Sequence, residues 1–184
     1  MNLELFKQKY QIKNNPIEKN QSGFKTRNEE LNELFGSLGG ISINKGLFKI
    51  HSFQSSKKWT EIICEIFPKY TNRISVYGFD WVGRQYAKDL DKDFTYLFDI
   101  ATGEDFELEQ PLSEFFNVDL IEYEEETLNT EEFNEWNKNK IELDFDQIVG
   151  YKIPLWLGGE DSINNYEIAD AEVYWEINRQ LMNK

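Results

Sequence analysis

The chain has little of the side-chain chemistry that metal binding and catalysis use. Its 184 residues include one histidine, His51, and one cysteine, Cys64. A lone cysteine excludes an internal disulfide, and this cysteine usage fits a reducing compartment. Two such residues cannot supply the four ligands of a structural zinc site. The sequence therefore favours a protein that binds over an enzyme, and we expect no cofactor and no metal.

Long apolar runs are also missing. The N-terminal stretch MNLELFKQKYQIKNN has no continuous apolar segment of the kind found in a signal peptide. No run approaches the roughly 18 apolar residues of a membrane-spanning helix. We therefore expect a cytoplasmic protein without a membrane partner.

Glycine-rich phosphate-binding motifs are absent as well. No G-x-x-x-x-G-K-S/T segment occurs, and no G-x-G-x-x-G segment follows a predicted strand. Gly36, Gly39 and Gly40 match neither spacing. The Gly39-Gly40 pair is more typical of a turn than of a phosphate cradle.

Basic residues are scarce in the second half of the chain. The net charge is −14, with +5 in residues 1–92 and −19 in residues 93–184. Between Asp93 and Asn137 there are 15 acidic residues and no Lys or Arg. Such a field repels nucleic-acid phosphates and attracts basic surfaces, so we expect a basic protein partner and no direct nucleic-acid contact. The alternative is that these acids only keep the protein soluble.

The strongest helical pattern lies between Trp59 and Phe67, where apolar residues recur at i, i+3, i+4, i+7 and i+8. Pro68 should end this helix, and we expect Cys64 within it to be inert core. Weaker patterns predict helices near residues 3–10, 29–35, 112–118 and 171–182, and one that begins at Thr130. We expect Gly36 to close the second helix, a polar connector at residues 14–22, and N-caps at Ser113, Thr130 and Asp170. Four residues of the last helix are expected to face inward, namely Val173, Tyr174, Ile177 and Leu181.

Short hairpins dominate the middle of the chain. The predicted strand pairs are 41–50 around Asn44-Lys45-Gly46, 73–77 with 84–88 around a turn at 78–83, and 94–100 with 105–108. Pro154 makes residues 149–157 an edge strand or an irregular run. Helices and strands alternate without regular βαβ spacing. The sequence therefore predicts an α+β fold, with a mostly antiparallel sheet and flanking helices in a single compact domain.

Two groups of acidic residues are candidate contact sites. Glu122, Glu124, Glu125 and Glu126 surround Tyr123 and form either a docking patch or a solvated loop. Glu160 and Asp161 follow Gly158-Gly159. Such a pair can ligate a divalent cation or act as acid and base, but it is more often a solvated rim or a helix cap.

The segment from Tyr77 to Gln85 is a third candidate. Aromatic residues exposed beside Arg84 would form an interface hot spot, and Trp81, Arg84 and His51 together would define a ligand-binding corner. The alternative is that Trp81 packs in the core, that Asp80 pairs with Arg84, and that His51 is structural.

Four segments in order resemble one bacterial family. They are Gly39-Gly40 with NKGLFKIH at 44–51, YGFDWVGRQYA at 77–87, VGYKIPLWLGGED at 149–161, and residues 170–175. The family is similar to the C-terminal domain of the immunity protein that protects bacteria against a type VI secretion DNase effector. Its N-terminal part is similar to the GAD-related insert domain of some tRNA-charging and amidotransferase enzymes. The resemblance covers roughly residues 35–182, which we take as an immunity-protein-like domain at 35–184 after a helical and polar segment at 1–34.

The resemblance implies neutralisation of a secreted toxin by direct binding, and no catalytic residue is carried over. A nuclease is the expected toxin, because nuclease sites hold phosphate and are basic, so an acidic inhibitor can cover them. The expected contacts are Glu122, Glu124, Glu125 and Glu126, with Glu160 and Asp161 as a second edge. The alternative is a small-ligand-binding or regulatory module whose site lies near His51, Trp81 and Arg84.

Overall fold

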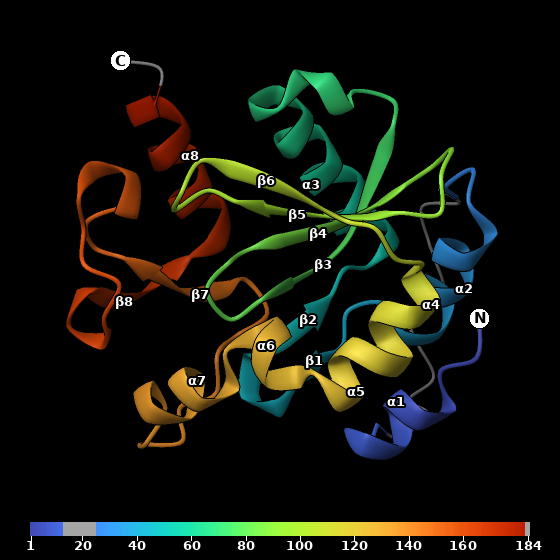
Figure 1. Cartoon of the computed structure of the whole chain (residues 1–184), viewed down its shortest axis with the longest axis horizontal. Coiled ribbons are helices and arrows are strands. Elements are labelled where there is room, and N and C mark those ends of the chain that lie inside the picture. Colours follow the sequence, from blue (N-terminus) through green and yellow to red (C-terminus); the bar gives the residue numbers. More distant parts are fainter. Residues whose placement is uncertain (13–24, 183–184) are drawn as a thin grey trace.

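A six-stranded antiparallel sheet forms the centre of the protein (Figure 1). The computed structural model describes residues 1–12 and 25–182. Strands pair in chain order, so each is hydrogen-bonded to the next. Their bounds are β1 (Ser42–Ile43), β2 (Phe48–Ile50), β3 (Ile74–Asp80), β4 (Gln85–Asp89), β5 (Thr95–Asp99) and β6 (Glu104–Leu108). The predicted α+β class, with its mostly antiparallel sheet in one compact domain, is confirmed.

A second, two-stranded sheet meets the main sheet at the end of β3. It consists of β7 (Gln147–Tyr151) and β8 (Tyr166–Asp170). The Val149 amide donates a 2.7 Å hydrogen bond to the Trp81 carbonyl oxygen, which connects β7 to the end of β3. Of the predicted run at residues 149–157, only the first part is a strand, because β7 ends at Tyr151, before Pro154. A short 3-10 turn, Leu155–Leu157, follows Pro154.

Helices cover both faces of the main sheet (Figure 1). On one face lie α3 (Phe53–Ile66) and α8 (Ala171–Met182). Their core includes Trp59, Phe79, Phe98 and Trp175. On the other face lie α1 (Glu4–Lys9), α2 (Glu29–Leu38), α4 (Leu112–Glu114), α5 (Leu120–Glu122), α6 (Glu124–Leu128) and α7 (Thr130–Trp136), with a π-helical turn, Phe115–Asp119, between α4 and α5.

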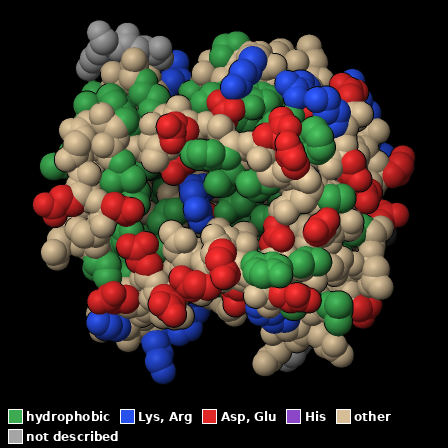
Figure 2. Space-filling model, in the orientation of Figure 1, with side chains coloured by type: hydrophobic (Ala, Val, Ile, Leu, Met, Phe, Trp, Pro, Cys, Tyr) green, Lys and Arg blue, Asp and Glu red, His purple; other side chains and the backbone are tan. Residues whose placement is uncertain are grey.

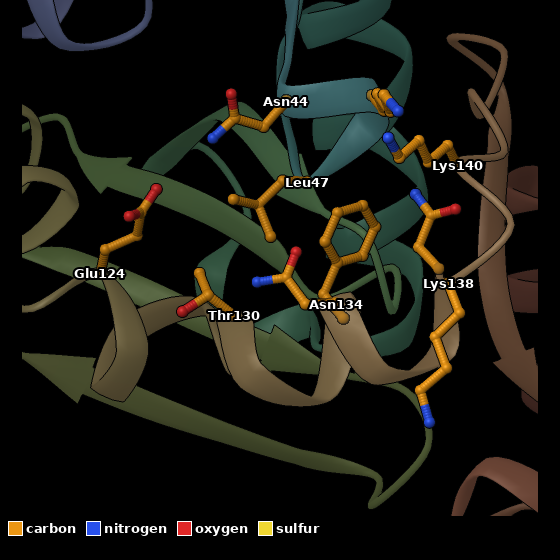
Figure 3. Close-up of a pocket in the computed structure, with 10 residues that line it drawn as sticks. Asn44, Leu47, Glu124, Thr130, Asn134, Lys138 and Lys140 are labelled. Carbon is orange, nitrogen blue, oxygen red and sulfur yellow. The ribbon is translucent and has the colours of Figure 1, made fainter.

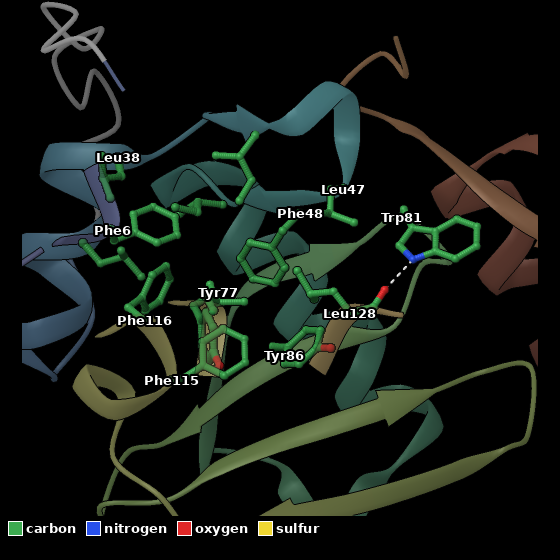
Figure 4. Packing of buried hydrophobic residues seen from close by; sticks show 14 of the residues in the cluster. Phe6, Leu38, Leu47, Phe48, Tyr77, Trp81, Tyr86, Phe115, Phe116 and Leu128 are labelled. Carbon is green, nitrogen blue, oxygen red and sulfur yellow. Dashed lines mark hydrogen bonds between the residues drawn. The ribbon is translucent and has the colours of Figure 1, made fainter. Parts of the chain in front are cut away.

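The core on this second face is rich in aromatic rings (Figure 4). Phe48, Tyr77 and Tyr86 from the strands meet Phe115 and Phe116 from the helical segment, with ring centroids 5–6 Å apart. Because both faces are covered, every residue of β3 and β4 is buried. This is why these two strands lack the alternation of a half-exposed strand.

The predicted turn at residues 78–83 begins too early, because β3 continues to Asp80. A Cβ atom on Gly78 would lie 2.7 Å from the Phe48 ring and 2.8 Å from the Lys49 carbonyl oxygen. Gly78 is therefore required for the close approach of β2 to β3 and not for a turn. Gly83, at φ +86°, occupies the turn itself.

Helix boundaries differ from the predictions at several caps. Gly36 lies inside α2, which continues to Leu38. The helix expected from Trp59 begins at Phe53, because Ser52 and Ser55 form a reciprocal capping box. The N-cap positions of α4 and α7 are Pro111 and Asn129, so the expected caps at Ser113 and Thr130 are wrong. The expected cap of α8 is confirmed, since the Asp170 carboxylate accepts a hydrogen bond from the Val173 amide.

The inward face of α8 is also corrected. Tyr174 is buried as expected, but Val173 and Ile177 are more than half exposed. Trp175 and Asn178 are buried in their place.

The first 12 residues carry the expected helix, and Phe6 is buried against Phe116. The polar connector expected at residues 14–22 lies outside the described residues. The domain boundary between residues 34 and 35 stays a prediction.

Candidate acidic binding face

The four clustered glutamates lie around the junction of α5 and α6. Glu122 ends α5, and the other three form the first turn of α6. Glu122, Glu125 and Glu126 are exposed, whereas Glu124 is half-buried. The four side chains therefore have different surroundings, although the sequence places them together.

Glu124 is held by the N-terminal helix. Its carboxylate accepts a 2.7 Å hydrogen bond from the Tyr10 hydroxyl and lies 2.9 Å from Lys9 Nζ. Burial, together with this hydrogen bond to Glu124, raises the pKa of Tyr10, so the hydroxyl stays protonated and donates. Lys9 also donates to the Leu120 carbonyl oxygen at 2.9 Å. Glu124 thus fastens α1 to the α5–α6 junction.

Glu125 stabilises the start of α7. Its carboxylate accepts a 2.8 Å hydrogen bond from the Glu131 amide and another from the Thr130 hydroxyl. A carboxylate at this position also favours the positive end of the helix dipole. Within residues 1–12 and 25–182, Glu122 and Glu126 form no such hydrogen bond or ion pair, so these two carboxylates are available to a partner.

The second acidic edge is connected to α7 through two tyrosines. The Tyr151 hydroxyl donates to Asp161 at 2.7 Å, and the Tyr166 hydroxyl donates to Glu132 of α7 at 2.7 Å. The Tyr166 hydroxyl also lies 3.4 Å from Asp161. Burial raises the pKa of both tyrosines, and their carboxylate partners raise it further.

Tyr166 therefore links Asp161 of the second group to α7, the helix whose start is stabilised by Glu125 of the first group. We name the exposed acids of the two groups, together with Glu131 and Glu132 of α7, the acidic face and define it as Glu122, Glu125, Glu126, Glu131, Glu132, Glu160 and Asp161. Figure 2 shows the molecule in the orientation of Figure 1, with Asp and Glu side chains prominent over the part where α6 and α7 lie. Glu131 and Glu132 were not among the predicted contacts. The proximity of Glu132 to Asp161 has no signal in the sequence, because it depends on the Tyr166 side chain of β8 contacting α7.

The residues of the predicted ligand-binding corner are not exposed aromatics. Trp81 is fully buried, and its indole nitrogen donates a 2.7 Å hydrogen bond to the Leu128 carbonyl oxygen. Arg84 pairs with Asp80 at 2.5 Å and donates to the Thr127 carbonyl oxygen at 2.9 Å. Trp81 and Arg84 are thus together at the C-terminal end of α6. This arrangement favours the alternative in which Trp81 packs in the core and Asp80 pairs with Arg84.

His51 lies apart from this pair, in the core beneath α3. It is fully buried, stacks on Phe79 with ring centroids 4.9 Å apart, and is 3.0 Å from the Gln85 side-chain oxygen. Burial lowers the pKa of His51 to about 4, so the ring is neutral at pH 7. Cys64 is half-buried, and burial raises the pKa of its thiol. These surroundings favour structural roles for both residues.

In the described part of the chain, no group of three or more His, Cys, Asp or Glu residues is arranged to hold a metal ion. None of the helices at residues 1–12 and 25–182 is both long and apolar enough to cross a membrane.

One known family is similar to the C-terminal part of the chain. Residues 110–182 match the family described as T6SS immunity protein Tdi1, C-terminal. The chain resembles the C-terminal domain of a type VI secretion immunity protein. This match covers α4 to α8 and all residues of the acidic face, and it supports an immunity-protein role with an effector toxin as partner. The resemblance of residues 35–109, and that of the N-terminal part to a GAD-related domain, stay predictions.

Among the solved structures that match, the following shares the fold over nearly the whole chain. The crystal structure of Atu4351 from Agrobacterium tumefaciens aligns with a TM-score of 0.67 and 20% sequence identity, covering 97% of this chain and 89% of that one. At this identity the likeness shows the fold alone. No curated protein matches the sequence.

Proposed function

We propose that this protein is a non-catalytic immunity protein that binds and neutralises a secreted toxin, a nuclease, through the acidic face. The observation that carries the proposal is the family match at residues 110–182, which contains every residue of that face. In this proposal the protein meets the incoming toxin in the cytoplasm and needs no cofactor.

Electrostatics gives the physical reason for pairing this surface with a nuclease. A nuclease must attract phosphate, so its substrate-binding surface is basic. Carboxylates at Glu122, Glu126 and Glu131 would accelerate encounter with such a surface, and burial of a few central contacts would supply most of the affinity. Glu124 and Glu125 are already engaged within the protein, so their part is to hold α1 and α7 in place.

Charge reversal on the acidic face tests the proposal. The toxin candidate is the protein encoded beside this chain's gene, purified in an inactive form. We expect the triple variant Glu122→Lys, Glu126→Lys and Glu131→Lys to associate with it at least tenfold more slowly at low salt. Raising the salt concentration should reduce this difference, because salt screens exposed charges.

A matched control reverses three exposed glutamates elsewhere, at Glu61, Glu107 and Glu109. Both triple variants change the net charge equally, so only the position of the charges differs. Equal rates for the two variants would exclude the acidic face as the contact. The absence of a complex with the unchanged protein, together with a harmless neighbour when expressed alone, would count against the immunity role itself.

The alternative of a ligand-binding module at His51, Trp81 and Arg84 has less support. Trp81 and His51 are fully buried, in different core clusters. A ligand at this location would have to displace core packing.

A further inference from the structure

α3 and α8 lie on the same face of the main sheet (Figure 1), and a groove of about 430 Å³ lies between them. Val173 and Ile177 of α8 line it, and their side chains are 55% and 53% exposed. Ile62 and Ile66 of α3 also line it and are half-buried. We name it the apolar groove. The pocket between the 3-10 turn Asn44–Gly46 and α7 differs, because its lining is mostly polar (Figure 3).

The two helices that border the apolar groove run side by side in the same direction. Lys58, in the second turn of α3, pairs with Glu172 in the first turn of α8. About two turns further along both helices, Glu65 and Arg179 line the groove together. On each helix the two lining aliphatic residues are four positions apart, so they form a short ridge on that side of the groove. A groove between two such ridges fits the single ridge of a third helix.

Acidic side chains border the apolar groove. Glu65, Glu172 and Glu176 line it, together with Arg179. The Arg179 guanidinium donates hydrogen bonds of 2.8 and 2.7 Å to the Glu176 carboxylate, so its charge is already matched within α8. The pair of Lys58 with Glu172 is highly exposed and contributes little. Three carboxylates against one guanidinium make the border of this groove attractive to cations.

The combination of apolar lining and charged border indicates a protein partner. Single exposed aliphatic residues are ordinary on protein surfaces, whereas a contiguous group with a polar border is typical of an interaction site. A second copy of this chain is a poor occupant. In a symmetric dimer the same surface meets itself, so Glu65, Glu172 and Glu176 would face their own copies and repel them.

We propose that the apolar groove binds a basic amphipathic helix of a partner protein. Apolar residues at i, i+3, i+4 and i+7 of that helix pack between the ridges of α3 and α8. Lys or Arg residues beside this apolar stripe pair with Glu65, Glu172 and Glu176. None of the residues that line the groove belongs to the acidic face. The proposal therefore goes beyond the toxin-binding function and needs no toxin for its test.

The test is an NMR titration of the full chain with isotope-labelled isoleucine methyl groups. The probe is a blocked helical peptide of about 15 residues, with Leu at i, i+3, i+4, i+7 and i+11 and with Lys and Ala at the other positions. We expect saturable shifts at the methyl groups of Ile62, Ile66 and Ile177.

Two comparison peptides separate charge from shape. One has Glu in place of every Lys, and the other has the same composition as the probe with its Leu residues spread around the helix. Each should bind at least roughly tenfold more weakly than the probe, which corresponds to about 1.4 kcal/mol.

The variant Val173→Ser/Ile177→Ser should also bind the probe roughly tenfold more weakly, as measured at the Ile62 and Ile66 methyl groups. The matched control is Leu5→Ser/Ile153→Ser, which removes two apolar side chains that are 60% and 55% exposed elsewhere. All four side chains are more than half exposed, so neither variant should unfold the protein. The control should bind the probe as the unchanged protein does.

The proposal is overturned if the probe does not shift these methyl groups, if either comparison peptide binds equally well, or if both variants weaken binding equally. Shifts of the same methyl groups when the protein alone is concentrated would also overturn it, because they would place a second copy of the chain in the groove.

Discussion

The indole nitrogen of Trp81 donates a 2.7 Å hydrogen bond to the carbonyl oxygen of Leu128 (Figure 4). Arg84, three residues further along the same hairpin, donates to the neighbouring Thr127 carbonyl oxygen. Together these bonds satisfy carbonyl groups at the C-terminal end of α6 and fasten that helix to the sheet. The glutamates at the start of α6 are thereby presented from a rigid support.

We expect Trp81→Phe to lower the free energy of unfolding by about 1–3 kcal/mol, because the Leu128 carbonyl loses its donor in a buried position. Trp156→Phe is the matched control, since the indole nitrogen of Trp156 is buried without a partner among the described residues. This second change should cost clearly less. Urea unfolding of both variants measures the difference, and equal losses would show that the hydrogen bond contributes nothing.

The burial of His51 predicts a pH dependence. An unfolded histidine with its usual pKa near 6.5 takes up a proton that the folded protein does not accept until about pH 4. Stability therefore falls as the pH falls through this window. At about 1.4 kcal/mol per pKa unit, His51 alone would remove about 3 kcal/mol.

Urea unfolding between pH 7 and pH 4 should show this loss, and His51→Gln should show a shallower dependence. Carboxylates titrate in the same range, so the comparison between the two proteins isolates the histidine. NMR of the His51 ring gives a second measurement, in which the neutral form should persist at pH 5. A ring that titrates near pH 6.5 in the folded protein would contradict the prediction.

Gly36 and Gly46 lie in opposite backbone surroundings, so we expect replacement by alanine to change stability in opposite directions. Gly36 is exposed inside α2 with nothing near its missing Cβ, so Gly36→Ala should stabilise by about 0.5–1 kcal/mol. Gly46 has φ +100°, and a Cβ there would lie 2.7 Å from Leu143. Gly46→Ala should destabilise by about 1–3 kcal/mol. Thermal unfolding measures both changes. If both variants were stabilised, or both destabilised, the roles given to these two glycines would be contradicted.

The corrected face of α8 gives a further prediction. Trp175 is fully buried and donates a 2.9 Å hydrogen bond to the Gly83 carbonyl oxygen, so Trp175→Ala should cost about 3–5 kcal/mol. Ile177 is 53% exposed, and Ile177→Ala should change stability by less than about 0.5 kcal/mol. Urea unfolding checks both. A large loss for Ile177→Ala would instead support the face that we expected from the sequence.

The contrast within α8 explains where sequence reasoning fails. Spacing alone made Val173, Tyr174, Ile177 and Leu181 a consistent apolar face, and Asp170 a cap. The cap is confirmed because it depends only on neighbouring backbone atoms. The buried face of α8 depends on where the sheet lies, and it includes Trp175 and Asn178. Local geometry was thus predictable, and the direction of packing was not.

The acidic face shows the same division. Its charge, and the positions of Glu122 to Glu126 and of Glu160-Asp161, follow from the sequence. That Glu124 and Glu125 bind within the protein, while Glu122 and Glu126 form no such contact within the described residues, depends on contacts with α1 and α7.

The sequence by itself determined the hairpins, the helical segments, the charge asymmetry and the resemblance, because these depend on composition and on residues close in the chain. Only the tertiary structure decided that Trp81 and His51 are core residues and that Glu132 and Asp161 share a surface. It also decided that Lys45 and Lys140 line the same pocket. Each of these relationships joins residues far apart in sequence, and burial and hydrogen bonding across such distances leave no local pattern to read.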